Sequence, residues 1–248
     1  MKKKVTTESY KPTASAEPIS YRGYRFPPDV ISYAVWLYYR FPLSLRMVEE
    51  MLLARGVEVT YETVRTWAVK FGLSIAKRIR SCAPVRGDKW HLDEVVVTMQ
   101  GKKYWLWRAV DQEGFVLDVL VQTRRDKKAA ERLMRKLLKR HGCPRVMVTD
   151  KLRSYAAANK ALGLGIEHRQ HKGLNNRAEN SHQPTLVREK VMRRFKSAGH
   201  LQRFASVFGT VANLFMGCRY NRRAQTKREA RIQAHEAWNW ASCAQMTA

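Results

Sequence analysis

The chain has 248 residues, 45% of them hydrophobic, so it can bury a substantial core, and this composition excludes an intrinsically disordered chain. Its 47 Lys and Arg against 21 Asp and Glu give a formal net charge of +26, which would repel itself in a compact fold unless a polyanion neutralised it. The excess is spread along the chain instead of lying in one tail. We therefore expect nucleic acid as the partner, and no small-molecule substrate.

The cysteines and the N-terminus indicate a cytoplasmic protein. The four cysteines are too far apart for a CxxC zinc or redox pair, which predicts reduced thiols: Cys82, Cys143, Cys218 and Cys243. The chain starts with Met-Lys-Lys-Lys but continues into polar residues, unlike a secretory signal, and it contains no long apolar span. We expect no membrane partner, and a flexible basic arm over residues 1–20.

Residues 21–80 are predicted to form a helical DNA-binding domain. A first helix begins at the PPD sequence of residues 27–29, and its apolar residues occur on all sides, which predicts burial. Ser44 is a plausible cap for a second helix that Gly56 ends, and Thr60 for a third. Two helices joined by a tight turn containing Gly match the helix-turn-helix pattern.

The third helix is the expected reader of DNA. Val64, Trp67 and Phe71 are spaced for burial on one face, which leaves four residues for DNA: Tyr61, Glu62, Arg65 and Lys70. An ordinary helical hairpin is the alternative, and the basic charge of the chain favours DNA reading. The basic stretch 73–88 contains Pro and Gly and predicts a linker, with a domain boundary near residue 80.

Residues 81–218 are predicted to form an α/β domain. Three runs with short turns between them predict antiparallel strands, at residues 90–99, 102–111 and 114–123. A helix, a strand, a short helix and a strand follow, at 126–142, 144–150, 153–162 and 166–170. The first of these helices has one apolar stripe, and its other face is almost wholly basic. The chain from Leu174 is predicted to be helical, with 219–248 as a basic helical tail.

Two acids on the predicted strands are candidate metal ligands. Asp93 lies in the middle of the first strand and Asp150 at the end of a later one, where an unpaired carboxylate is costly to bury. If these strands are neighbours, the two carboxylates can meet, and Glu179 from a following helix is the candidate third acid. Hard oxygen ligands suit two Mg²⁺ ions, with Mn²⁺ as a substitute. Taken singly, each acid could instead pair with Arg, cap a helix or be solvated.

Long sequence motifs carry a family resemblance that runs from about residue 20 to about residue 215. The chain resembles the insertion-sequence-six family of bacterial transposases in four segments: GDKWHLDEVVV, GKKYWLWRAVDQEGFVLDVLVQTRRD, RVMVTDKLRSY and HKGLNNRAENSHQPT. The resemblance implies an RNase H-like catalytic core, a mixed sheet flanked by helices, after the helix-turn-helix domain. It also implies that Asp93, Asp150 and Glu179 are the catalytic, metal-binding acids.

The same resemblance implies the reaction and its partners. Such an enzyme binds the inverted repeats at the ends of its element, exposes 3′-hydroxyls and joins them to target DNA in replicative cointegrate formation. Two DNA ends must meet, so at least a homodimer is expected on double-stranded DNA. Asn176, Asn180 and His182 are expected to line the site. For His168, His171 and His182, DNA contact or packing is favoured over metal ligation, because imidazole suits Zn²⁺ better than Mg²⁺.

One departure from the family pattern leaves an alternative open. Leu186 and Val187 follow SHQPT where a basic run is expected, so Arg188 or Lys190 is assigned the phosphate contact instead. A catalytically defective DNA-binding or regulatory copy is therefore the alternative function. A serine or tyrosine recombinase would require an activated nucleophile, and metal dependence would distinguish it from this prediction.

Overall fold

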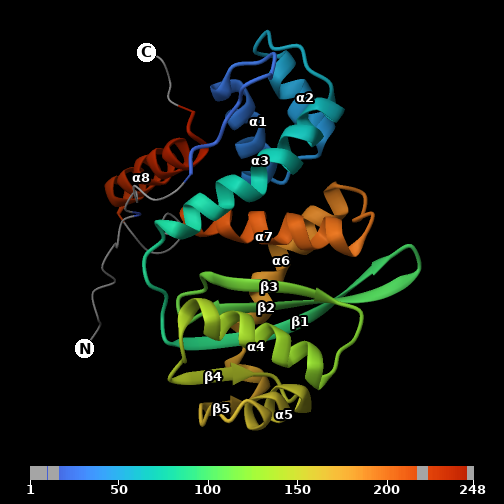
Figure 1. Ribbon diagram of the computed structural model, residues 1–248, viewed down its shortest axis with the longest axis vertical. Helices are drawn as coiled ribbons and strands as arrows, with labels where there is room; N and C mark the ends of the chain where they lie inside the picture. The colour runs from blue at the N-terminus through green and yellow to red at the C-terminus, as the bar shows by residue number, and fades with distance from the viewer. Residues whose placement is uncertain (1–9, 11–16, 217–222, 245–248) are drawn as a thin grey trace. The chain divides into compact units, whose positions relative to one another are not determined.

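The computed structural model describes residue 10 and residues 17–216 and 223–244, and these divide into two compact units (Figure 1). The first unit comprises the described residues up to Pro84 and from Thr210 onward, and the second is Val85–Gly209. Most of the predicted arm over 1–20 therefore lies outside the described residues. No helix among the described residues is long and apolar enough to cross a membrane.

The first unit is helical, and its helices begin where the sequence predicts. It contains α1 (Pro28–Arg40), α2 (Leu45–Leu53), α3 (Tyr61–Ser81) and α8 (Ala224–Ser242). Ser44 accepts a hydrogen bond from the Met47 amide and caps α2, and Thr60 accepts one from the Thr63 amide and caps α3. Gly56 follows α2 with a φ of 74°, a left-handed conformation that glycine adopts without strain. Both predicted caps are confirmed.

The third helix is longer than predicted, so the expected linker over 73–88 is wrong for residues 73–81. Ile75, Ala76 and Ile79 are buried and continue the apolar face beyond Gly72. Gly72 does not end the helix, because the ring of Tyr39 packs directly against it, and a Cβ there would lie 2.9 Å from a ring carbon. Tertiary packing thus overrides the low helix propensity of glycine.

The C-terminal helix belongs to the first unit and is not a separate tail. The buried Arg78 guanidinium on α3 donates to the carbonyls of Trp240 (3.0 Å) and Ala241 (2.9 Å), which lie in the last turn of α8. A cation at this position satisfies terminal carbonyls and complements the negative end of the helix dipole. The Trp238 indole N–H also donates to Ser32 on α1 over 3.0 Å. The described part of 219–248 is therefore tied to α1 and α3.

The second unit is built on a five-stranded mixed sheet in the order β3-β2-β1-β4-β5. The strands are β1 (Lys89–Met99), β2 (Lys102–Asp111), β3 (Val116–Gln122), β4 (Val146–Thr149) and β5 (Glu167–Gln170). The first three are antiparallel, and β4 runs parallel to both β1 and β5. This confirms the predicted order of strands and the mixed sheet.

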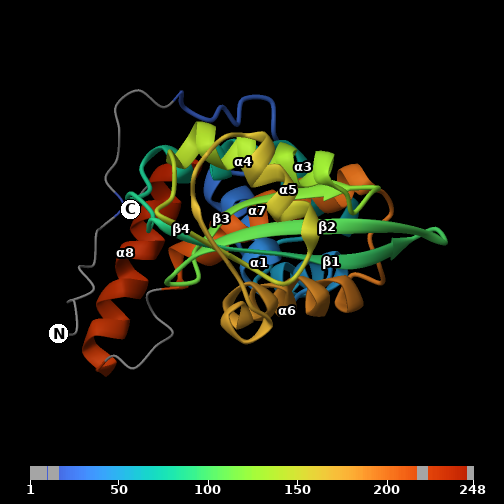
Figure 2. The same ribbon diagram turned by 90° about the horizontal axis from the view of Figure 1, so that it is seen from below.

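Helices cover both faces of this sheet (Figure 2). On one face lie α4 (Lys127–His141) and α5 (Arg153–Ala161), and on the other lies α6 (Asn176–Val191), which contacts β1 and β2. A short 3₁₀ turn, η1 (Lys172–Leu174), precedes α6, and α7 (Ala198–Leu214) follows it. Trp90 and Leu92 of β1 join α4 and α5 in one buried core. Because side chains alternate along a strand, His91 and Asp93 point to the opposite face, toward α6.

Candidate active site

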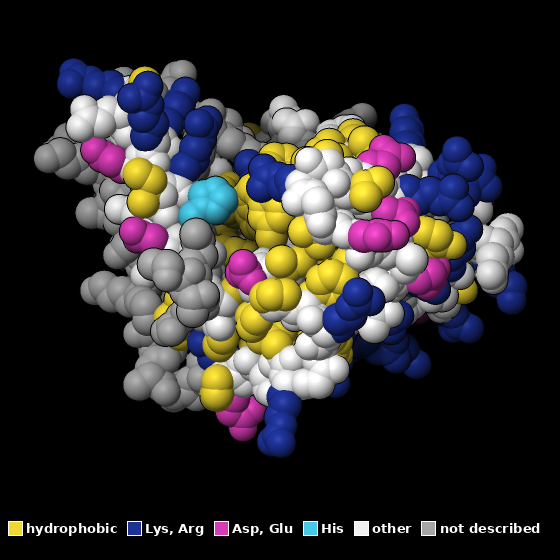
Figure 3. All heavy atoms as spheres, turned by 90° about the horizontal axis from the view of Figure 1, so that it is seen from above, with side chains coloured by type: hydrophobic (Ala, Val, Ile, Leu, Met, Phe, Trp, Pro, Cys, Tyr) yellow, Lys and Arg dark blue, Asp and Glu magenta, His cyan; other side chains and the backbone are white. Residues whose placement is uncertain are grey.

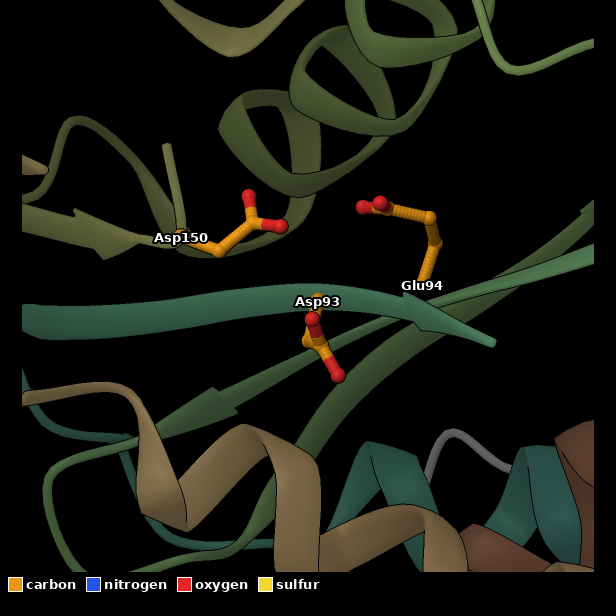
Figure 4. Close-up of side chains that lie close together, drawn as sticks. All are labelled: Asp93, Glu94 and Asp150. Atoms are coloured by element: carbon orange, nitrogen blue, oxygen red, sulfur yellow. The ribbon is translucent and has the colours of Figure 1, made fainter. Parts of the chain in front are cut away.

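Three carboxylates lie close together where β1 passes the end of β4, with Glu94 and Asp150 on one side of β1 and Asp93 pointing to the other (Figure 4). Asp93 and Glu94 are consecutive on β1, and Asp150 follows the last residue of β4. One oxygen of each side chain lies within 4.8 Å of the others. The pairing of β1 with β4 produces this juxtaposition, since His91 of β1 is in register with Val148 of β4. The structure thus brings Asp93 and Asp150 together, as the sequence predicts.

The Asp93 carboxyl is the most perturbed acid of this group. Burial, and then repulsion from Glu94, Asp150 and Glu179, raises its pKa to about 7. Its side chain is 13% exposed, and one oxygen lies 3.5 Å from Nε2 of His182. Burial lowers the pKa of His182 to about 3, so this imidazole is neutral at pH 7 and does not neutralise Asp93.

Asp150 has two different neighbours. One oxygen accepts a hydrogen bond from the Leu152 amide over 3.0 Å, which orders the turn into α5. The other lies 3.5 Å from the guanidinium of Arg125. The side chain remains 25% exposed, so the carboxylate can still be reached from solvent. Asp150 can therefore order the turn into α5 with one oxygen and still offer its carboxylate to a metal ion.

Glu94 is an acid beside Asp93 and Asp150 that the sequence did not single out. Its side chain is fully buried and accepts hydrogen bonds from Tyr155 (2.7 Å) and from Nε of Arg125 (2.7 Å). Because Arg125 already neutralises it, Glu94 is less available to a metal than Asp93. Glu94 shares the core-facing side of β1 with Trp90 and Leu92. A charged residue at such a position was the feature of the sequence that could have identified it. Glu94 holds Arg125 beside Asp150.

The third predicted acid lies on α6, which covers the face of the sheet toward which Asp93 points. Glu179 lies half-buried in the first turn of α6, and its charge contributes to the raised pKa of Asp93. It is not one of the three acids whose oxygens lie within 4.8 Å of one another. Asn175 is fully buried and donates 2.9 Å to the Leu92 carbonyl, which ties the start of α6 to β1 beside Asp93.

A buried arginine holds the middle of the same helix. Arg108 of β2 is paired in register with Asp93 and donates to the Ser181 carbonyl (2.5 Å) and to the Thr185 hydroxyl (2.6 Å). These contacts flank Pro184, which has no N–H to donate within the helix. Complete burial lowers the pKa of Arg108 to about 10, so it remains charged at pH 7. Arg108 and Asn175 therefore fix the helix that carries Glu179.

The predicted DNA contacts divide into exposed and buried residues. On α3, Glu62, Arg65 and Lys70 are exposed and Tyr61 is half-buried, while Val64, Trp67 and Phe71 are buried as predicted. On α6, the exposed members of the predicted set are Asn176, Asn180 and Lys190.

Two predicted contacts are not available to DNA in this structure. His182 is 2% exposed and lies beside Asp93, and Arg188 is 1% exposed with its guanidinium over the ring of Phe204. Neither side chain reaches the surface, because both point into the domain, so the predicted phosphate contact is left to Lys190. Packing, one of the two roles foreseen for His182, is the role that this position supports.

The donor set fits hard divalent cations. Carboxylate oxygens are the ligands that Mg²⁺ prefers, and a divalent cation would relieve the repulsion that raises the pKa of Asp93. Among the described residues, the only group of at least three His, Cys, Asp or Glu with metal-binding geometry is Asp93, Glu94 and Asp150. His168 instead bonds to Thr149 over 2.8 Å. Asp93 on β1 and Asp150 after β4 lie together on a mixed five-stranded sheet, which is the arrangement expected of a metal-dependent polynucleotidyl transferase domain.

Comparison with known proteins gives the family. A family model described as a DDE domain matches residues 87–218. The chain is 33% identical over 174 residues to the transposase for insertion sequence element IS257 in transposon Tn4003 of Staphylococcus aureus, covering 68% of this chain and 78% of that protein. It is equally similar to the transposase for the insertion sequence-like element IS431mec of the same species. The chain belongs to the insertion-sequence-six family of DDE transposases and is a metal-dependent polynucleotidyl transferase.

Solved structures also match the chain. The catalytic core domain of HTLV-2 integrase in complex with magnesium is 17% identical with a TM-score of 0.41, over 58% of this chain and 93% of that one. The simian T-cell lymphotropic virus intasome in complex with PP2A regulatory subunit B56 gamma is 16% identical with a TM-score of 0.39, over 53% of this chain and 50% of that one.

Proposed function

We propose that this transposase binds the inverted repeats at the ends of its element, exposes their 3′-hydroxyls and joins them to target DNA, giving cointegrates by replicative transposition. The observation that carries the proposal is the meeting of Asp93 and Asp150 within a DDE domain, with the pKa of Asp93 raised to about 7. The proposal places this reaction in the bacterial cytoplasm, with a homodimer or a larger assembly holding two ends.

In this proposal Asp93, Asp150 and Glu179 hold two Mg²⁺ ions, and Mn²⁺ can replace them. Two ions bound there would supply Lewis acidity for the attacking water or 3′-hydroxyl and for the leaving oxygen of an in-line displacement. Asp93 and Asp150 supply oxygens from the sheet, and Glu179 supplies one from α6. Glu94 and Arg125 keep Asp150 oriented, while Arg108 and Asn175 hold α6 in place.

Recognition of the element ends is assigned to the N-terminal part of α3. Tyr61, Glu62 and Arg65 lie in its first two turns, where the recognition helix of a helix-turn-helix domain contacts base edges. Arg65 also pairs with Glu62, which orients its guanidinium along the exposed face. Lys70 lies further along the same helix and suits a phosphate contact. Figure 3 shows exposed Lys and Arg side chains at several places on the surface of the protein.

The experiment that tests this function is Mg²⁺-dependent joining of a plasmid-borne element's ends to a second plasmid. The parent is compared with Glu179→Gln, and Glu94→Gln is the matched control because it removes an acid of the same cluster that Arg125 already neutralises. Joining by the parent and at least partly by Glu94→Gln, but not by Glu179→Gln, supports the proposal. Joining by Glu179→Gln refutes the assignment of Glu179 as the third metal-binding acid. Joining by none of the three favours the alternative, a catalytically defective regulatory copy.

A further inference from the structure

The outward face of α4 carries a straight row of cations. Four exposed residues at helical spacings of four, three and four form this row, which we call the outer basic row: Lys128, Arg132, Arg135 and Lys139. At a rise of about 1.5 Å per residue, the row is about 17 Å long. The opposite side of α4 packs Ala130, Leu133 and Leu137 into the core. The row is therefore the solvent side of a firmly anchored helix.

The charge of this row is not balanced by the fold. Two other cations of α4, Lys136 and Arg140, turn toward β3 and pair with Asp118 at 2.8 and 2.7 Å. Within the part of the chain that the structure describes, Lys128 and Lys139 take part in no ion pair. The remaining two have weak or neutral partners: Arg135 lies 3.8 Å from Glu131, and Arg132 donates to the Gln122 amide.

The row also opposes the stability of its own helix. Like charges four residues apart on a helix destabilise it by about 0.2–0.5 kcal/mol per pair, and the row contains two such pairs. Lys128 stands in the first turn, where the positive end of the helix dipole disfavours a cation. A solvated face of alternating charge would avoid both penalties. The arrangement instead suits a polyanion lying along the helix.

The row starts three residues after Arg125, which is a neighbour of Asp150 at the candidate active site. Arg125, which lies 3.5 Å from Asp150, precedes the Asp126 cap of α4 by one residue. A DNA backbone that follows the row therefore reaches the candidate active site at the first turn of α4. In Figure 2, α4 lies on the face of the sheet opposite α6, the helix that carries Glu179.

We propose that the outer basic row binds the phosphate backbone of the target DNA. Lys and Arg contacts to phosphates carry no sequence information, and a straight row of four exposed cations suits the repeated charges of a phosphate backbone. DNA that is bound without recognition of its sequence is more consistent with the target than with the element ends. Recognition of the sequence of the ends is assigned to α3. The inference rests on the proposed function, since it presupposes that ends and target are bound at different places.

The test compares two variants that each remove two exposed lysines from the catalytic unit. Lys128→Gln/Lys139→Gln changes the row, and Lys102→Gln/Lys103→Gln, at the β1–β2 turn, is the control. On a duplex of unrelated sequence, the plot of log affinity against log salt becomes shallower by about 1.8 in the row variant, about 0.9 per lost phosphate contact. Binding of the element ends and cleavage at them stay at the parent level, while half-maximal joining requires more target plasmid.

Three results overturn the proposal: an unchanged salt slope in the row variant, an equal effect in the control, or cleavage that falls in step with joining. The last result would assign the row to the element ends. If the parent protein cleaves no ends, the proposed function fails. The salt slope on the unrelated duplex still decides whether the row binds DNA, so the two failures are distinguishable.

Discussion

Replacing Asp93 with asparagine is expected to stabilise the metal-free protein while abolishing strand cleavage. The pKa of Asp93 rises from 3.8 to about 7 on folding, so its ionisation is opposed by burial and by the neighbouring acids. At about 1.36 kcal/mol per unit of pKa, this shift corresponds to at most about 4 kcal/mol. Asparagine keeps the shape of the side chain without the charge, and therefore removes this penalty.

The pH dependence of this gain follows from the direction of the shift. Below the ordinary pKa of 3.8, Asp93 is protonated in both the folded and the unfolded chain and the penalty is absent. As the pH rises, the unfolded chain ionises first and the folded state loses stability, until Asp93 ionises in the folded chain near pH 7. The stabilisation by Asp93→Asn should thus grow between about pH 4 and pH 7 and level off above it.

Urea unfolding in EDTA at about pH 5 and pH 8 measures this effect. Glu113→Gln, which removes an exposed acid from a turn of the same unit, is the control and should change little at either pH. Added Mg²⁺ should raise the stability of the parent and not that of Asp93→Asn, because ligand binding stabilises only a protein that holds the ligand. A variant that is no more stable than the parent at pH 8, or a gain independent of pH, would refute the reasoning.

Three further predictions follow from the same contacts. Asp150→Asn should abolish cleavage and leave binding of the element ends intact, as measured by gel shift, since it changes a proposed metal ligand and not α3. Retained cleavage would remove Asp150 from the proposed catalytic set. Arg65→Ala should weaken end binding and, if Arg65 contacts a phosphate, lower the salt slope by about 0.9; an unchanged isotherm would count against α3 as the reader. Arg125→Gln should destabilise the protein by about 3–5 kcal/mol because it leaves Glu94 buried without its cation. The double variant with Glu94→Gln should recover most of that loss in thermal unfolding, and no recovery would contradict the pairing.

Local signals in the sequence were sufficient to predict the helix caps, the antiparallel strands and two acids of the candidate site, Asp93 and Asp150. Ser44 and Thr60 cap helices as predicted, because capping depends only on residues a few positions away. Alternating strands and short turns predicted the antiparallel part of the sheet for the same reason. Asp93 and Asp150 could be chosen because a carboxylate within or at the end of an apolar strand requires a partner.

Other features depended on contacts between distant residues. Residues 73–81 were expected to belong to a linker, but they continue α3, in which Gly72 packs against the ring of Tyr39. The C-terminal helix was expected to be a tail, and Arg78 binds its last turn. Neither contact is encoded in the local pattern, since each partner is separated from the other by many residues of chain.

The sequence by itself determined the family, the order of the strands and helices, and two of the acids, Asp93 and Asp150, that lie together at the candidate site. Only the tertiary structure decided how those acids are held. It paired the buried Glu94 with Arg125. It also buried His182 and Arg188, two polar residues that were predicted to contact DNA at the surface. Burial and the approach of charges are properties of the packed chain, so pKa shifts such as that of Asp93 arise only when β1, β4 and α6 come together.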